Sequence, residues 1–190
     1  MLANLWWCLS RHPEVYDQLK QEIDHLGDEH PTMEQVNTLK YLRAVINESL
    51  RLYPVVPINL REAVEDTTLP VGGGKNGRSP LFIAKGEVAM WNLWAMHRRE
   101  DVYGKDAEHY RPERWLEGLR PGWAFLPFSG GPRVCLGQHF ALTEASYIVI
   151  RMVQKFREVD GVDDGPWREK VTLTTVNASG CKVRMTARRL

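Results

Sequence analysis

The stretch of sequence that decides the fold is Phe128-Ser-Gly-Gly-Pro-Arg-Val-Cys-Leu-Gly137. It places a cysteine, Cys135, in a glycine-rich loop, with Arg133 two residues before it. A long apolar helical pattern begins directly after the loop, at residue 138. The start of a helix offers free backbone N–H groups and the positive end of its dipole, and both favour an anion. The loop therefore predicts a cysteine that acts as a thiolate ligand.

The composition fits one globular domain or part of a longer protein, because the chain has 190 residues. A formal net charge of +1 gives no reason to expect a nucleic-acid partner. The cysteines Cys8, Cys135 and Cys181 lie far apart and form no C-x-x-C pair, so a disulfide scaffold is not expected. No apolar run reaches the roughly 18 residues of a membrane span. Residue 1 opens inside a helical pattern without a capping residue, so we expect the chain to begin within an element of a longer protein.

Apolar periodicity predicts helices in the first part of the chain and again over residues 138–156, with short strands between and after them. Helices are expected over residues 2–8, 14–26, 39–52, 92–97 and 138–156, with a cap at Thr32. Short strands are expected over residues 55–58, 59–64, 81–83 and 87–90, followed by an irregular connection over residues 101–122. A β-hairpin is expected from residues 171–175 and 182–186 around a turn at 177–180.

Glu48 and Arg51 lie three residues apart on the predicted helix 39–52, so their side chains share one face. One interpretation is a surface ion pair that contributes a few tenths of a kcal/mol. The other is a buried network in which the forked guanidinium of Arg51 has a second partner. Arg114, in the sequence Pro112-Glu-Arg-Trp115, is the candidate for a further member of such a network.

Two other patterns are set aside. Residues 72–79 nearly spell a phosphate-binding loop, but Arg78 replaces the lysine and Pro80 interrupts the helix start that such a loop requires. Cys135 and His139 have a spacing that occurs in metal sites on helices, but zinc would need two further ligands. We therefore expect a strand connection at residues 72–79 and an outward helix residue at His139.

An anionic sulfur in a loop of this kind is a suitable axial ligand for a haem iron. Glu48-Ser-Leu-Arg51, Pro112-Glu-Arg-Trp115 and the cysteine loop follow in this order, and together they resemble the C-terminal part of a cytochrome P-450, a haem-thiolate monooxygenase. The resemblance covers essentially the whole chain, residues 1–190, as one partial domain. It implies a mainly α fold with small β-sheets, the C-terminal part of an orthogonal helical bundle with short strands.

The resemblance assigns roles to named residues. It implies heme b (iron protoporphyrin IX) as the cofactor, Cys135 as the axial ligand of its iron, and Glu48, Arg51 and Arg114 as a structural triad. Arg133 and Arg61 match positions that bind the haem propionates, which need cationic donors; a solvated charge is the alternative for each. The remaining haem-site residues are Phe128, expected beside the sulfur, and Gly131 and Gly137, expected to allow tight turns and N–H bonds to the sulfur.

Several stretches are similar to the fungal group of this family that hydroxylates n-alkanes and fatty acids at the terminal carbon. They cover residues 69–75, 103–107, 122–131 and 141–147. Two segments would line the distal pocket by resemblance, and they contain Val55, Val56, Pro57 and Ile58, and the expected hairpin tip with Val176, Asn177 and Ala178. Both are mainly apolar, which suits a small lipophilic substrate.

The implied reaction inserts one oxygen atom from O₂ into a C–H bond, with electrons from NADPH delivered by NADPH–cytochrome P-450 reductase. The family's distal acid–alcohol pair is not found in this sequence, so no catalytic residue is assigned. Full-length members lie on the cytoplasmic face of the endoplasmic reticulum membrane; this chain has no anchor, and we expect a truncated form that binds haem weakly. The alternatives are a haem-thiolate peroxygenase or isomerase, and a non-catalytic haem-binding fragment.

Overall fold

The computed structural model describes residues 1–163 and 165–188. The chain forms two compact units, one from Met1–Pro57 with Leu93–Leu190 and a smaller one from Ile58–Asn92. Each unit is described by itself. Helices with small antiparallel sheets make up the structure, which confirms the expected mainly α class.

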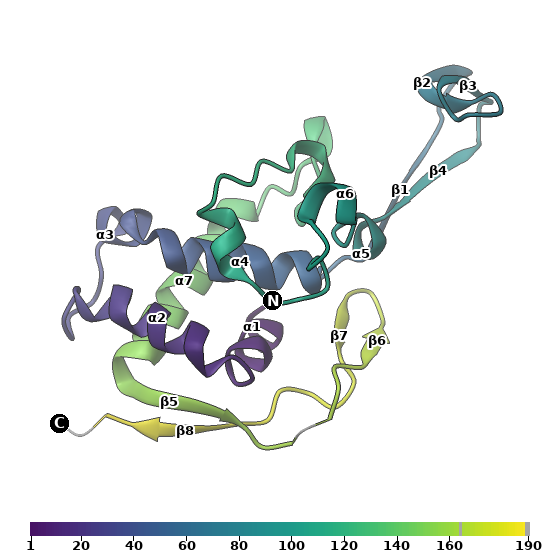
Figure 1. Cartoon of the computed structure of the whole chain (residues 1–190). Helices are drawn as coiled ribbons and strands as arrows, with labels where there is room; N and C mark the ends of the chain where they lie inside the picture. The colour runs from purple at the N-terminus through teal and green to yellow at the C-terminus, as the bar shows by residue number, and fades with distance from the viewer. Residues whose placement is uncertain (164, 189–190) are drawn as a thin grey trace. The chain divides into compact units, whose positions relative to one another are not determined.

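The first unit is built on the amphipathic helices that the sequence predicts. Its longer helices are α1 (Leu2–Leu9), α2 (Pro13–Asp24), α4 (Lys40–Leu52) and α7 (Gln138–Lys155). Its short helices are α3 (Met33–Thr38), α5 (Leu93–Met96) and α6 (Glu100–Tyr103), and its 3-10 turns are η1 (Pro112–Trp115), η2 (Gly122–Ala124) and η3 (Gly131–Arg133). Helices α2, α4 and α7 pack against one another in this unit (Figure 1).

The core of the first unit lies where α1, α2, α4 and α7 meet. Apolar side chains at helical spacing face inward from each of them, as expected of a stripe that recurs every three to four residues. Fully buried members include Leu5, Leu9, Leu19, Ile23, Leu42, Val45, Val149, Ile150 and Val153. This core fixes the directions of α4, which carries Glu48 and Arg51, and of α7, which follows the cysteine loop.

Capping fixes where α3 and α4 begin. Thr32 and Gln35 form a capping box, in which each side chain accepts the backbone N–H of the other residue at 3.2 and 2.8 Å. Helix α4 has no side-chain cap of its own. Instead the carboxylate of Glu22, on α2, accepts the backbone N–H groups of Tyr41 and Leu42, both at 2.8 Å. A carboxylate at this end also favours the helix dipole, so Glu22 ties α2 to the start of α4.

The C-terminal strands pair differently from the expectation. The prediction of a hairpin that pairs residues 171–175 with residues 182–186 is wrong. β8 (Val183–Ala187) pairs with β5 (Phe156–Gly161), which continues directly from α7, and β6 (Glu169–Val171) pairs with β7 (Thr175–Asn177). Both pairs are antiparallel, and the expected tip at residues 176–179 therefore belongs partly to a strand.

The second unit consists of two antiparallel strand pairs. β1 (Ile58–Glu62) pairs with β4 (Val88–Asn92), and β2 (Thr67–Gly73) pairs with β3 (Ser79–Ile83). The sequence predicted strands near β1, β3 and β4, and residues 74–78 connect two strands as expected. It missed β2, because the side chains from Thr67 to Gly72 are all exposed and show no alternation.

Among the residues that the structure describes, no helix has the length and apolarity needed to cross a membrane.

Candidate functional site

The carboxylate of Glu48 is the centre of a buried polar network. It accepts a forked pair of hydrogen bonds from Arg51, from Nε to Oε2 at 2.8 Å and from Nη2 to Oε1 at 2.7 Å. Arg114 Nε donates to Oε1 at 3.0 Å, and Trp115 Nε1 donates to Oε2 at 2.9 Å. The side chains of Glu48 and Arg51 are fully buried and that of Arg114 is 3% exposed, so this is an interior network and not a surface pair.

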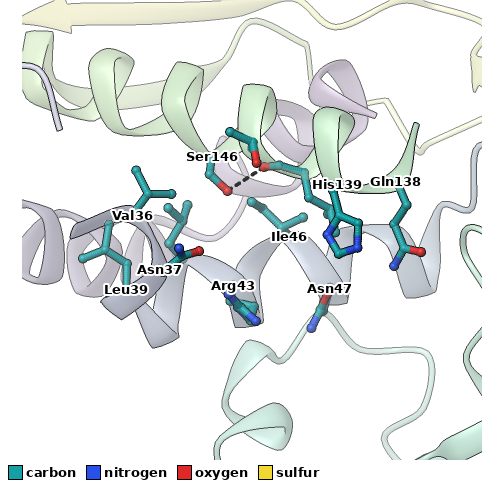
Figure 2. Close-up of a pocket in the computed structure, with 12 residues that line it drawn as sticks. Val36, Asn37, Leu39, Arg43, Ile46, Asn47, Gln138, His139 and Ser146 are labelled. Atoms are coloured by element: carbon teal, nitrogen blue, oxygen red, sulfur yellow. Dashed lines mark hydrogen bonds between the residues drawn. The ribbon is translucent and has the colours of Figure 1, made fainter. Parts of the chain in front are cut away.

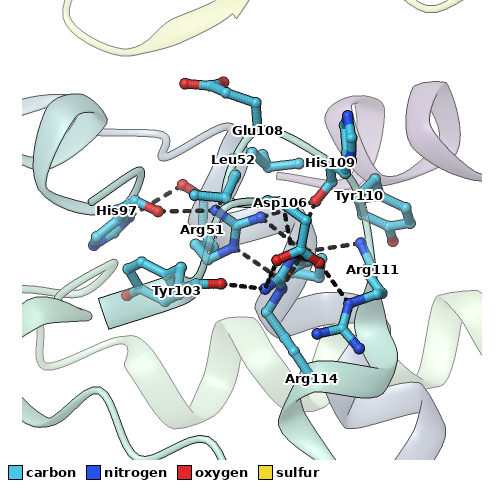
Figure 3. Close-up of polar contacts among 12 residues, drawn as sticks. Arg51, Leu52, His97, Tyr103, Asp106, Glu108, His109, Tyr110, Arg111 and Arg114 are labelled. Atoms are coloured by element: carbon cyan, nitrogen blue, oxygen red, sulfur yellow. Dashed lines mark hydrogen bonds and ion pairs between the residues drawn. The ribbon is translucent and has the colours of Figure 1, made fainter. Parts of the chain in front are cut away.

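The guanidinium groups of this network also bind backbone carbonyls and a second carboxylate (Figure 3). Arg51 donates to the carbonyl of Ala107 at 2.6 Å, and Arg114 donates to that of Tyr103 at 2.7 Å. Arg114 also pairs with the Asp106 carboxylate at 3.2 Å. Two buried cations therefore face two carboxylates and several carbonyls, which satisfies their donors in a dry environment.

Asp106 is the member of the network that sequence reasoning missed. Burial alone would raise its pKa, but hydrogen bonds from Arg114 and Arg111 outweigh that effect and lower the pKa. The network thus fixes α4, α6 and η1 to one another. No local pattern singles out Asp106, because its role depends on the fold of the connection over residues 101–122.

The cysteine loop is closed by a backbone hydrogen bond. The N–H of Cys135 donates to the carbonyl of Phe128 at 2.9 Å, and Gly137 is the N-cap residue of α7. A Cβ placed on Gly137 would lie 3.9 Å from the Cys135 sulfur, which places the glycine directly beside the thiol. The Cys135 thiol is exposed, whereas the Phe128 ring packs against the hydrophobic core. The loop therefore presents its thiol outward just before the first turn of a long helix.

Two backbone features shape the same loop. Ser129 and Gly131 both have positive φ angles, 63° and 66°. The tightest contact belongs to Gly130, where a Cβ would come within 2.7 Å of the Trp123 ring and 3.0 Å of Leu126. Side-chain carbon atoms do not approach that closely, so glycine is required at position 130 for packing and at 131 for conformation. The Gly130–Trp123 contact is a further feature that the sequence did not reveal.

Exposed apolar side chains lie in the cysteine loop and in the segments that flank it in the sequence. Leu136 is 100% exposed, Phe140 and Trp123 are each 72% exposed, and Val134 is 42% exposed. Arg133 lies in the same loop and is also exposed. These groups fit a flat apolar macrocycle that carries a central metal ion and anionic edge groups. The thiolate would bind the metal ion, the guanidinium of Arg133 would bind an anionic edge group, and the apolar side chains would contact the ring.

The other predicted site residues fall into both units. Arg61 belongs to β1 of the second unit, where its guanidinium donates to the carbonyl of Leu60 at 2.7 Å and lies 5.2 Å from the centre of the Trp91 ring. Ile58 begins the same strand and is 46% exposed. In the first unit the predicted distal segments do meet, because the N–H of Thr175 donates to the carbonyl of Val55 at 2.8 Å.

Exposure differs among the predicted pocket residues. Val56 and Val176 are exposed, as is Ala178, and Pro57 is half-buried. Asn177, in contrast, is buried at 8% exposure. The exposed members give this part of the first unit a mainly apolar surface.

A separate cavity of about 330 Å³ lies between α4 and α7 (Figure 2). Its lining mixes apolar side chains with Asn37, Arg43, Asn47 and His139. Within residues 1–163 and 165–188, no group of three or more His, Cys, Asp and Glu side chains is placed to hold a metal ion. The cavity has neither a carboxylate nor a thiol in its lining, and the chemistry-bearing thiol lies in the neighbouring loop.

Comparison with known proteins identifies the family of the chain. Residues 2–180 match the family model described as Cytochrome P450. The chain is 48% identical over 183 residues to "Cytochrome P450 monooxygenase FPY7" of Fusarium mangiferae, covering 96% of this chain and 35% of that protein. It is 49% identical over 186 residues to "Cytochrome P450 monooxygenase himC" of Aspergillus japonicus, covering 97% and 33%. With "Cytochrome P450 52A13" of Debaryomyces hansenii the identity is 45% over 194 residues, covering 97% and 37%.

The chain belongs to the cytochrome P450 family. It spans about a third of the length of the curated relatives that it matches.

Proposed function

We propose that this chain provides the thiolate side of a haem site, with Cys135 as the axial ligand of heme b. The observation that carries the proposal is the exposed Cys135 thiol, held just before α7 in a loop that also exposes Val134 and Leu136. Arg133 lies in the same loop and would bind a haem propionate. The buried network around Glu48 would hold α4, α6 and η1 rigid around this site.

The proposed reaction is that of a monooxygenase, in which one oxygen atom from O₂ enters a C–H bond. Bound haem with a thiolate ligand supplies the activation of O₂, because thiolate ligation favours O–O cleavage. The role of this chain is to hold the sulfur, orient the haem through its arginines and exclude water with the apolar surface. NADPH–cytochrome P-450 reductase is the proposed electron donor.

The proposed substrate is a small lipophilic molecule, an n-alkane or fatty acid attacked at its terminal carbon. Support comes from the mainly apolar surface of Val56, Pro57 and Val176, which suits an alkyl chain. Relatives named Cytochrome P450 52A from Debaryomyces hansenii and Candida tropicalis match nearly the whole chain. For the protein in cells we propose the cytoplasmic face of the endoplasmic reticulum membrane.

The haem proposal is tested by titrating the chain with haem and recording the reduced-plus-CO difference spectrum. We expect a Soret band at the thiolate position in the wild type and in Cys181→Ser, and its loss in Cys135→Ser. Cys8 cannot replace the ligand, since burial raises the pKa of its thiol well above the usual range. An unchanged spectrum in Cys135→Ser would overturn the assignment.

Turnover is tested separately, with a medium-chain fatty acid as substrate. The monooxygenase proposal expects a terminally hydroxylated product with O₂, NADPH and reductase. Product formed with peroxide alone, and not with NADPH and reductase, would instead indicate a haem-thiolate peroxygenase. Haem binding without product under either condition would indicate a non-catalytic haem-binding protein.

A further inference from the structure

His97 is a fully buried histidine that none of the family motifs includes. It follows α5 directly and has 0% exposure. Its Nε2 lies 3.0 Å from the backbone nitrogen of Leu126, and its Nδ1 lies 3.2 Å from the carbonyl oxygen of Arg51. Because both ring nitrogens make hydrogen bonds, the His97 side chain links two backbone segments in addition to filling space.

These two contacts fix the protonation state of the ring. The backbone N–H of Leu126 can only donate, so Nε2 must accept and carries no proton. The carbonyl of Arg51 can only accept, so Nδ1 must carry the proton. Both bonds are therefore made by one neutral tautomer, and the other tautomer or the charged ring would break the bond to Leu126. Burial lowers the pKa of His97 to about 4, which agrees with a neutral ring at neutral pH.

His97 stands between the Glu48 network and the cysteine loop. On one side, Arg51 Nη1 donates to the His97 carbonyl at 2.9 Å while the ring donates back to the Arg51 carbonyl, so the two residues are joined by a reciprocal pair (Figure 3). On the other side, the bond to Leu126 reaches the segment that enters the cysteine loop. The Phe125 ring packs on the imidazole with ring centres 5.3 Å apart.

The segment held by His97 leads directly to the thiol. Leu126 precedes Phe128 by two residues, and the Phe128 carbonyl accepts the N–H of Cys135. The Leu126 carbonyl accepts the N–H of Ser129 at 3.0 Å, which starts the loop. A continuous set of hydrogen bonds therefore runs from Glu48 through Arg51 and His97 to Leu126. The segment that begins at Leu126 leads to Phe128, whose carbonyl binds the N–H of Cys135.

We propose that His97 is a positioning residue for Cys135: its Nδ1–H tautomer fastens the cysteine loop to the buried Glu48–Arg51–Arg114 network. The loop geometry stands by itself, and only the consequence for haem ligation rests on the proposed function. Removing the ring nitrogens frees the Leu126 end of the loop and leaves the sulfur less firmly held.

The proposal is tested on the whole 190-residue chain by NMR. The ¹⁵N shifts of the imidazole at neutral pH distinguish the tautomers, and His97→Gln assigns the signal. We expect the Nδ1–H form. A charged ring or the Nε2–H form would overturn the proposal, and this measurement needs no variant that folds poorly.

Amide hydrogen exchange then tests the link to the loop. In His97→Phe, which keeps a ring but no hydrogen bonds, we expect exchange at Leu126 and Cys135 to rise about tenfold or more. His97→Gln can donate and accept, so it should remain near the wild-type rates. The matched control is His12→Phe, since half-buried His12 contacts the Cys8 carbonyl at 2.8 Å, and it should leave both amides unchanged. Equal rates in His97→Phe and the wild type, or equally fast exchange in His97→Gln and His97→Phe, would overturn the proposal.

With haem bound, His97→Phe should lose part of the thiolate-type Soret band that His97→Gln retains. A wild type that binds no haem but shows the Nδ1–H tautomer and the exchange effects contradicts the proposed function and leaves this inference standing. A normal haem spectrum in a His97→Phe variant with unchanged exchange contradicts this inference and leaves the proposed function standing.

Discussion

Replacing Glu48 by glutamine is the most informative perturbation of this structure, because it removes one charge and almost no volume. The carboxylate is fully buried and accepts hydrogen bonds from donors on Arg51, Arg114 and Trp115. It also accepts the backbone N–H of Arg111 at 2.9 Å. Every one of these groups can donate and none can accept, so an amide nitrogen has no suitable position in the site.

The cost follows from which oxygen is replaced. If the amide nitrogen takes the place of Oε2, it faces the Nε of Arg51 and the indole N–H of Trp115. If it takes the place of Oε1, it faces Arg51, Arg114 and the Arg111 amide. Two or three buried donors lose their acceptor in either case, at about 1–3 kcal/mol each. Removing one partner of a buried ion pair costs about 3–5 kcal/mol, so we expect Glu48→Gln to lower the free energy of unfolding by about that amount.

Urea unfolding followed by tryptophan fluorescence measures this difference at constant m-value. Glu117→Gln is the matched control, since Glu117 pairs with Arg111 at the surface with a side chain that is 57% exposed. That variant should cost about 1 kcal/mol or less. If Glu48→Gln costs no more than Glu117→Gln, the carboxylate does not organise the network and the reasoning is refuted.

Three further predictions concern pH, capping and packing. Because burial, with Arg51 and Arg98 nearby, lowers the His97 pKa from 6.5 to about 4, the unfolded chain binds this proton first as the pH falls. The contribution of His97 to stability should therefore be constant above about pH 6.5 and decline by about 3 kcal/mol as the pH falls to about 4. Glu22→Ala should cost about 1–2 kcal/mol and expose the Tyr41 and Leu42 amides to exchange, because it removes the cap of α4. Gly130→Ala should cost about 1–3 kcal/mol and alter tryptophan emission, because its Cβ would lie 2.7 Å from Trp123.

Each of these has its own control. A decline between pH 6.5 and 4 that persists undiminished in His97→Gln would show that another group causes it. Gln21→Ala, at the exposed neighbouring position, should cost little, and equality with Glu22→Ala would contradict the capping role. Gly130→Ala should cost less in a Trp123→Ala background, and strictly additive effects would refute the close contact.

The helices could be predicted from the sequence because their stabilising contacts repeat along the chain. Helices α4 and α7 differ from the predicted ranges by one residue, since apolar side chains at helical spacing face the core along most of each helix. The capping box at Thr32 was equally visible, because both of its members lie within one turn. Cys135, Glu48 and Arg51 were recognisable as candidates for the same reason, since short local patterns carry them.

The rest depends on contacts outside regular helices and strands, or between strands far apart in the sequence, which no local pattern records. The hairpin prediction failed because the true partner of β8 is β5, which begins at Phe156, and turn residues at 177–180 resemble a hairpin turn whichever strand pairs. Asp106, Gly130 and His97 were missed because each acts through a neighbour brought near by the fold: Arg114, Trp123 and Leu126. Their residue types alone are ordinary for connecting segments.

The hydrogen bond between the Thr175 N–H and the Val55 carbonyl links the two proposed pocket segments, although they lie far apart along the chain. A backbone shift in one segment should therefore also move the other segment. In directed evolution of substrate preference, substitutions at Val56 and Val176 should show epistasis, because a shift that accommodates one change also displaces the other. Libraries that vary the two segments together will sample pocket shapes that sequential single-site libraries do not reach.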